Sequence, residues 1–157
     1  MTIKLIAIGK TDHKALQELI SIYEKRLAHY IRFELCIVPD IKNVKNLSEA
    51  QQKEKEGELI LKQLQATDTL VLLDENGKQF SSIDFSGYLQ KKMNAGLKQL
   101  VFVIGGPYGF SPTVYEKAQG KISLSKMTFS HQMIRLFMVE QLYRGFTILK
   151  NEPYHHQ

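Results

Sequence analysis

The sequence predicts an α/β fold with a mostly parallel, Rossmann-like sheet. The main observation is that short apolar runs alternate with longer helical patterns from one end of the chain to the other. One run, Leu-Val-Phe-Val-Ile at residues 100–104, is apolar throughout, which is typical of a strand covered on both faces. Because no linker, repeat or low-complexity tract divides the chain, we expect residues 1–157 to form a single domain.

Five apolar runs have the length and the β-branched or aromatic content of strands. In chain order they are Ile3–Ile8, Phe33–Val38, Thr69–Leu73, Gln99–Ile104 and Lys121–Ser125. We expect the third strand to break at the residues Asp-Glu-Asn-Gly-Lys that follow it, because Asn76-Gly77 is a common turn dipeptide. Strands separated by helices favour parallel pairing, since each helix returns the chain to the same end of the sheet.

Helices are expected between these strands and after the last one. They cover residues 12–30, 48–65, 81–94, a short segment after Ser111-Pro112, and 131–150. Asp12 is a plausible N-cap of the first helix. Ser48 followed by Gln51 has the spacing of a capping box, and Ser111 before a proline has the pattern of an N-cap followed by a first-turn proline.

The last predicted helix, residues 131–150, is apolar around most of its circumference. A surface helix needs only one apolar stripe, so the second side of this helix needs a partner of its own. A central core helix would explain the pattern. A homodimer interface would explain it as well and is slightly favoured, because the last helix of a small α/β domain usually has an outer face.

Composition limits the classes of function. The formal net charge of +5 permits a polyanionic partner without proving one, because the basic residues are spread along the chain. The single cysteine, Cys36, excludes an internal disulfide and lies in an apolar run where we expect it to be buried. The histidines show no metal-ligand spacing, so no metal is expected. No apolar stretch approaches a membrane span, and we expect a cytoplasmic protein.

Three loops follow predicted strands and are therefore expected at one edge of the sheet. They are Leu73-Asp74-Glu75, the glycine turn Ile104–Phe110 and the hydroxyl-rich loop Leu124–Phe129. Open α/β sheets bind ligands at this edge, often through backbone groups, so the loops predict the walls of a cofactor pocket. The turn lacks the spacing of a dinucleotide-binding motif and the lysine of an NTP-binding loop. A simple tight turn and a solvated acidic loop are the alternatives.

The C-terminal part of the chain also contains candidates for catalysis and for RNA binding. Tyr154 and His155 lie in the tail Asn-Glu-Pro-Tyr-His-His-Gln, where proton transfer, base stacking or simple fraying are all open. Arg135 and Arg144 are candidates for phosphate contacts. Arg144 lies four residues after Glu140, the favourable order for a helical ion pair, whereas Arg135 has no acidic residue at that spacing.

The motifs Gly-Gly-Pro-Tyr-Gly-Phe, Ser-Leu-Ser-Lys-Met-Thr-Phe-Ser-His-Gln-Met-Ile-Arg, Glu-Gln-Leu-Tyr-Arg and Asn-Glu-Pro-Tyr-His-His resemble those of the ribosomal RNA large subunit methyltransferase H family, in the SPOUT superfamily. The resemblance covers the whole chain. It implies a deep C-terminal trefoil knot, a homodimer and S-adenosylmethionine as cofactor. The implied reaction is methylation of N3 of a pseudouridine in helix 69 of 23S rRNA on assembled ribosomes.

The resemblance also implies roles for individual residues. His155 is the expected catalytic base or the group that steers the uracil edge, with Tyr154 stacking or hydrogen bonding, and Arg135 and Arg144 are possible RNA contacts. The implied cofactor contacts are Leu73, Gly105, Leu124, Ser125, Lys126, Met127, Thr128 and Phe129. Two alternatives are a SPOUT enzyme that acts on another RNA and a ribosome-associated binding module without turnover. The intact Pro-Tyr-His ending favours an enzyme.

Overall fold

The computed structural model describes residues 1–156 and contains a five-stranded sheet with the strand order β2-β1-β4-β3-β5. Every pairing among these strands is parallel, so the predicted α/β class is confirmed. The strands are β1 Thr2–Ile8, β2 Arg32–Val38, β3 Asp68–Gln79, β4 Gln99–Ile104 and β5 Gly120–Ser123. The helices are α1 Lys14–Leu27, α2 Glu49–Leu61, α3 Ser82–Asn94, α4 Pro112–Lys117 and α5 Met133–Leu149, with a 3₁₀ turn at Val44–Asn46.

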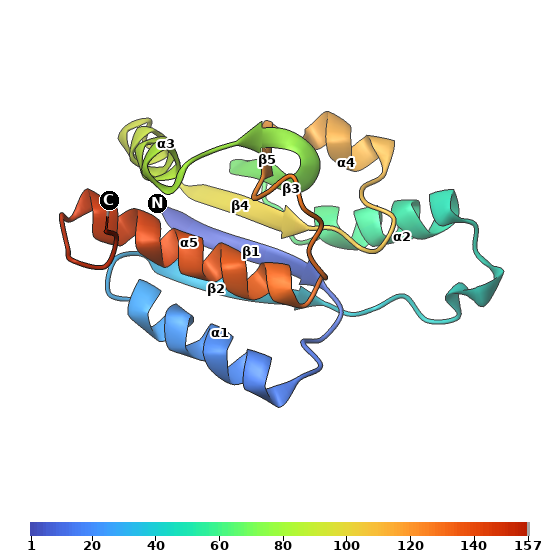
Figure 1. Ribbon diagram of the computed structural model, residues 1–157. Helices are drawn as coiled ribbons and strands as arrows, with labels where there is room; N and C mark the ends of the chain where they lie inside the picture. The colour runs from blue at the N-terminus through green and yellow to red at the C-terminus, as the bar shows by residue number, and fades with distance from the viewer. Residues whose placement is uncertain (157) are drawn as a thin grey trace.

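Helices cover both faces of the sheet (Figure 1). The central strand β4 shows why its sequence is apolar throughout, because its side chains alternate between two cores. Leu100 and Phe102 pack into the core under α1, α3 and α5. Val101 and Val103 pack into the core under α2 and α4. The expectation that this strand is covered on both faces is therefore confirmed.

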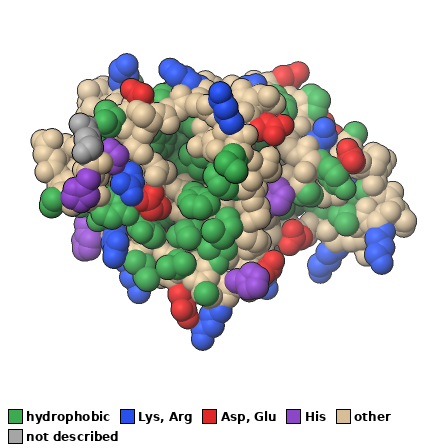
Figure 2. Space-filling view, viewed as in Figure 1, with side chains coloured by type: hydrophobic (Ala, Val, Ile, Leu, Met, Phe, Trp, Pro, Cys, Tyr) green, Lys and Arg blue, Asp and Glu red, His purple; other side chains and the backbone are tan. Residues whose placement is uncertain are grey.

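Helix α5 lies between α1 and α3 on one face of the sheet. Its inner side is fully buried through residues such as Met138 and Leu142, which confirms the interpretation as a core helix for that side. On its outer side, Met133 and Phe137 are 41% and 37% exposed. Figure 2 shows hydrophobic side chains gathered in the middle of the face formed by α5 and α1. The outer side of α5 therefore has an apolar surface that the described residues leave partly uncovered.

Two of the predicted helix starts are confirmed, and one is wrong. The Ser48 hydroxyl accepts from the Gln51 backbone nitrogen at 3.1 Å, and the Gln51 side-chain oxygen accepts from the Ser48 backbone nitrogen at 2.9 Å, which forms the capping box. The Ser111 side chain caps α4 ahead of its first-turn proline. Helix α1 instead begins after His13 and has no side-chain cap, while the Asp12 nitrogen donates to the side chain of Gln132.

The turn predicted at Asn76-Gly77 is wrong. Strand β3 continues to Gln79, and its register against β5 shifts between Leu73 and Lys78. A Cβ at Gly77 would lie 2.5 Å from the carbonyl carbon of Ile122, so glycine is needed here for close backbone approach rather than for a turn. The pairing of β3 with β4 ends at Leu73, and the residues that follow are left to line a cavity.

Three other expectations concern the chain as a whole. Cys36 is half-buried rather than buried, with its sulfur 3.7 Å from the side-chain oxygen of Gln63. Between residues 1 and 156, no helix is both long and apolar enough to span a bilayer. The trefoil knot stays a prediction, because strand order and pairing do not define how the chain passes through its own loops.

Candidate cofactor pocket and C-terminal cluster

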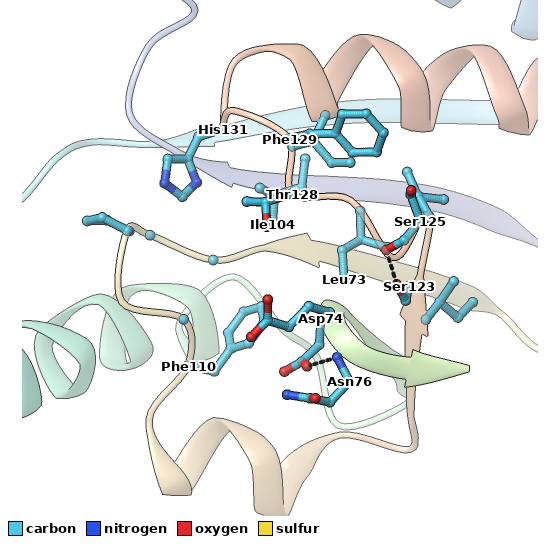
Figure 3. Close-up of a pocket in the computed structure, with 18 of the residues that line it drawn as sticks. Leu73, Asp74, Asn76, Ile104, Phe110, Ser123, Ser125, Thr128, Phe129 and His131 are labelled. Atoms are coloured by element: carbon cyan, nitrogen blue, oxygen red, sulfur yellow. Dashed lines mark hydrogen bonds between the residues drawn. The ribbon is translucent and has the colours of Figure 1, made fainter. Parts of the chain in front are cut away.

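A cavity of about 410 Å³ lies at the carboxyl ends of β4 and β5 and beside the part of β3 that follows its pairing with β4. All three segments that the sequence placed at this edge line the cavity, although Leu73-Asp74-Glu75 lies within the extended β3 and not in a loop. Figure 3 shows several of their side chains around one space. Of the residues implied as cofactor contacts, all except Lys126 are among its walls: Leu73, Gly105, Leu124, Ser125, Met127, Thr128 and Phe129. The structure therefore brings together segments that are separated by about fifty residues of sequence.

The glycine turn after β4 forms one wall and presents bare backbone. Gly109 has a φ of +79°, a region that favours glycine, and its nitrogen donates to the Gly106 oxygen at 3.1 Å. A Cβ at Gly105 would lie 3.1 Å from the Phe110 ring. A Cβ at Gly106 would overlap the carboxylate of Glu56. The segment is thus both a tight turn and a cavity wall, and its shape requires glycine at positions 105 and 106.

Glu56 lies behind this wall and is 3% exposed. Its Oε1 accepts from the Gln52 side chain at 2.9 Å, and among the described residues its Oε2 has no hydrogen-bond partner. Burial raises the pKa of Glu56, and the nearby charge of Asp40 raises it further. The burial of Glu56 was not predicted, because the charged residues around it in the helix, Glu54, Lys55 and Glu58, are exposed.

The hydroxyl-rich loop after β5 forms the opposite wall. The Ser123 hydroxyl donates to the Ser125 carbonyl oxygen at 2.7 Å, and the Ser125 hydroxyl accepts from the Met127 nitrogen at 2.9 Å. The Ser130 hydroxyl accepts from the Met133 nitrogen at the start of α5. These serines therefore hold the loop in one shape by local side-chain to backbone bonds.

The charged side chains that line the cavity are acidic, apart from one histidine. Asp74 and Glu75 line the β3 side and His131 the rim near α5, while no Lys or Arg of the described residues is among the walls. The Asp74 carboxylate accepts from the Tyr115 hydroxyl and from the Asn76 nitrogen. Burial and the bond to Asp74 raise the pKa of Tyr115 to about 12, so this phenol stays a donor. The role of Tyr115 was not predicted from the sequence, because Tyr115 and Asp74 are too far apart in the chain to form a local pattern.

The C-terminal residues Tyr154 and His155 pack on the end of α5 instead of fraying. Glu140 Oε1 accepts from Arg144 Nη2 at 2.7 Å and from the Tyr154 hydroxyl at 2.9 Å. The Arg144 guanidinium lies 4.6 Å from the Tyr154 ring centroid, and its Nη1 is 3.2 Å from His155 Nδ1. Burial raises the pKa of Tyr154, as do hydrogen bonds with Tyr23 and Glu140. The predicted Glu140–Arg144 ion pair is confirmed.

The prediction that Arg135 contacts RNA phosphate is corrected by the structure. Its side chain is 1% exposed and lies inside the protein beside the end of β1. The guanidinium donates to the carbonyl oxygens of Ile8, Gly9 and His131 and to the Thr11 hydroxyl, at 2.7–3.0 Å. Arg135 therefore ties the start of α5 to the loop after β1, and its hydrogen bonds go to carbonyl oxygens and a hydroxyl, while the charges of Asp12 and Asp40 favour its protonated form.

The cavity and the C-terminal cluster lie at opposite ends of α5. His131 and Ile134, at the start of the helix, line the cavity. Tyr154 and His155 follow its last residue, and a helix of 17 residues is about 25 Å long. Figure 1 shows the C-terminus at the end of α5 remote from the carboxyl ends of the strands. Within one chain, the two sets of candidate residues do not form a single site.

Comparison with known proteins gives consistent results. The family model described as "Predicted SPOUT methyltransferase" matches residues 1–155. The chain is 77% identical to a ribosomal RNA large subunit methyltransferase H of Flavobacterium johnsoniae and 75% identical to that of Flavobacterium psychrophilum, over 100% of each chain. The same protein of Christiangramia forsetii is 71% identical, again over 100% of both chains.

A solved SpoU methyltransferase, AviRb from Streptomyces viridochromogenes in complex with AdoMet, aligns with 96% of this chain and 61% of that chain. Its TM-score is 0.45 and its sequence identity 10%, so this likeness adds nothing to the assignment. The family model and the full-length relatives are sufficient by themselves. The chain belongs to the SPOUT methyltransferase family.

Proposed function

We propose that this protein is an S-adenosylmethionine-dependent methyltransferase of large-subunit ribosomal RNA that modifies N3 of a pseudouridine in helix 69 of 23S rRNA. The names of full-length relatives support the class of RNA. The resemblance of the motifs supports the nucleotide, the assembled ribosome as substrate and hence the cytoplasm as the place of action. The observation that carries the proposal is the cavity beside β3 and at the ends of β4 and β5.

The residues of the cavity suit S-adenosylmethionine. Its volume of about 410 Å³ is in the range of small-ligand sites, and two of its walls offer backbone groups that a polar ligand can bind. The carboxylate of Asp74 suits a ligand with positive charge. We propose that Gly105, Leu124 and the loop up to Phe129 hold the cofactor mainly through backbone N–H and C=O groups. Lys126 is outside the cavity walls and stays a prediction.

We also propose that the protein works as a homodimer, with α5 of each subunit packed on α5 of the other. The exposed Met133 and Phe137 lie on one outer side of α5 near the cavity, and Glu140 and Arg144 continue the same helical row towards the tail. Antiparallel packing of two such rows about a two-fold axis would bring the C-terminal cluster of each subunit to the cavity of its partner. The cluster and the cavity are about 25 Å apart within one chain, but a cluster and a cavity from different subunits would then lie side by side.

The C-terminal cluster suggests what each group does to the base. Arg144 donates to His155 Nδ1, so a neutral imidazole carries its proton on Nε2 and offers a donor to a uracil carbonyl. The raised pKa of Tyr154 keeps its hydroxyl protonated, so Tyr154 contributes a donor or a stacking face. We therefore propose that His155 steers the uracil edge and that the N3 proton passes to solvent. Arg144 positions the imidazole, and its contact with RNA stays a prediction.

When bound, S-adenosylmethionine supplies a methyl group on a sulfonium, whose carbon–sulfur bond breaks as the base nitrogen attacks. The protein has to align the base with that methyl group and to keep water away from it. Phe129 lines the cavity, and its ring centroid is 4.9 Å from that of Phe137, which lines a smaller pocket next to it. These two apolar rings suit the second task.

The test of the proposed function is direct. Purified protein, S-adenosylmethionine with an isotopically labelled methyl group and ribosomes from a strain that lacks the corresponding modification should yield 23S rRNA with one labelled nucleotide. Mass spectrometry of RNase fragments should place the label on a pseudouridine of helix 69. Label at another nucleotide would refute the specificity, and cofactor binding without transfer to any RNA would indicate a binding module.

The proposed dimer can be tested with a single substitution on α5. Phe137→Glu should place a charge in the apolar contact and shift the protein from dimer to monomer, since an unpaired buried charge costs several kcal/mol. Light scattering at micromolar concentration measures the mass. The matched control is Val44→Glu, because Val44 has the same 37% exposure but lies in the 3₁₀ turn between β2 and α2 and not on α5. A wild-type protein that is monomeric under these conditions would contradict the proposed homodimer.

A further inference from the structure

The acidic side of the cavity has a feature that backbone recognition of a cofactor does not require. Asp74 is half-buried, and each of its carboxylate oxygens has a neutral donor: the Asn76 nitrogen at 2.8 Å and the Tyr115 hydroxyl. Within residues 1–156, no ion pair involves Asp74. Figure 3 shows Asp74 on the side of the cavity that faces Thr128 and Phe129. Its negative charge is therefore held in place and is not neutralised by the protein.

We propose that Asp74 makes the pocket prefer the cationic cofactor S-adenosylmethionine over its neutral product S-adenosylhomocysteine, and that Tyr115 is the positioning residue that fixes the Asp74 carboxylate. This inference rests on the proposed function, because it takes the cavity to be the cofactor site. In this proposal the backbone of Gly105 and of residues 124–129 binds the groups that cofactor and product share, and Asp74 distinguishes the two by charge.

The surroundings of Tyr115 make it suitable for this role. Its ring packs edge-on against Phe110, with the centroids 5.8 Å apart, and Lys121 Nζ lies 5.5 Å from the ring centroid. Phe110 and Tyr115 both line the cavity, so the phenol is held between the glycine turn and β5. The hydroxyl donates to Asp74 and cannot itself neutralise the carboxylate.

The chemistry of the reaction explains why charge would discriminate the two ligands. When N3 of the base bonds to the methyl carbon, the carbon–sulfur bond breaks and its electron pair stays on sulfur, so the sulfonium becomes a neutral thioether. The two ligands share the adenosine, amino and carboxylate groups and differ by one methyl group and one positive charge. By Coulomb's law, a fixed carboxylate that is partly shielded from solvent would change the relative affinity by a factor on the order of ten if it lay roughly 6 Å from the sulfonium.

Calorimetric titration of the full-length dimer with each of the two ligands measures this preference. The quantity compared is the dissociation constant of S-adenosylhomocysteine divided by that of S-adenosylmethionine. In Asp74→Asn this ratio should fall roughly tenfold. Tyr115→Phe keeps the charge and should lower the ratio less than Asp74→Asn does. The matched control is Glu116→Gln, because Glu116 is an exposed carboxylate next to Tyr115 that does not line the cavity, and solvent screens its charge. Its ratio should stay near that of the wild type.

Several outcomes would overturn the inference. If Asp74→Asn weakens both ligands by the same factor, Asp74 binds a group that they share, such as a ribose hydroxyl, and charge selectivity is refuted. If neither affinity changes, Asp74 has no role in binding. If the variant does not fold, the wild type still decides: sinefungin, which has an ammonium-bearing carbon in place of the methylsulfonium, must bind more tightly than S-adenosylhomocysteine. Binding of none of the three by the wild type would instead refute the cofactor assignment itself.

Discussion

Co-expression of a Gly105→Val subunit with a His155→Ala subunit should restore methylation that neither variant shows alone. Gly105 lies in the cavity wall, and His155 lies at the far end of α5, about 25 Å away along the helix. If each active site takes its cavity from one subunit and its tail from the other, a mixed dimer contains one intact site. Random pairing makes half of the dimers mixed, so about a quarter of the wild-type rate is expected.

Two measurements accompany that experiment. His155→Ala alone should lower the rate of ribosome methylation by roughly 10²-fold, because the base loses an orienting donor. Since Arg144 occupies His155 Nδ1, we expect this deficit to be independent of pH. A deficit that shrinks as the pH approaches the ionisation of the nucleobase would show that His155 accepts the N3 proton. The mixed dimer must show the recovered rate; an inactive mixture would refute a site shared between subunits.

Gly105→Val should abolish cofactor binding in a protein that still folds. A Cβ at this position would already lie 3.1 Å from the Phe110 ring and 3.3 Å from the Gly109 oxygen, and the valine methyl groups would push the turn out of shape. We expect calorimetry to show a loss of affinity of at least about 10²-fold, equivalent to about 2.7 kcal/mol.

A matched glycine variant separates this effect from general damage. Gly87 lies in α3, where a Cβ would meet no atom within 4 Å, so Gly87→Val should leave cofactor affinity unchanged. Circular dichroism melting of both variants shows whether each is folded. Wild-type affinity in folded Gly105→Val would exclude the glycine turn from the cofactor site.

Much of the fold was predictable because its causes are local. Alternation of apolar runs with helical patterns is enough to indicate a parallel α/β sheet, and the Ser48 capping box needs only residues three apart in sequence. The three segments that line the cavity were predictable for a related reason, although the first of them lies within β3 and not in a loop after it. In a parallel sheet the carboxyl ends of all strands lie at one edge, so the sequence places these segments near each other without any knowledge of their contacts.

Other predictions failed where the deciding contact is distant in the sequence. Asn76-Gly77 has the composition of a turn, but the close approach of the Ile122 backbone makes it part of β3. Arg135 was expected to contact RNA, but its guanidinium is buried against carbonyl oxygens at the end of β1, more than 120 residues earlier. The hydrogen bond between Tyr115 and Asp74 is another example, because no spacing in the sequence indicates it.

The sequence by itself determined the class of fold, the strand ends that form the pocket and, through its motifs, the resemblance to a methyltransferase family. Only the tertiary structure showed that the cavity and the His155 tail lie at opposite ends of α5. Residue types and spacing describe what each segment can do, and they carry no distance between segments. That distance is set by how a rigid helix of 17 residues packs on the sheet, which depends on contacts along its whole length.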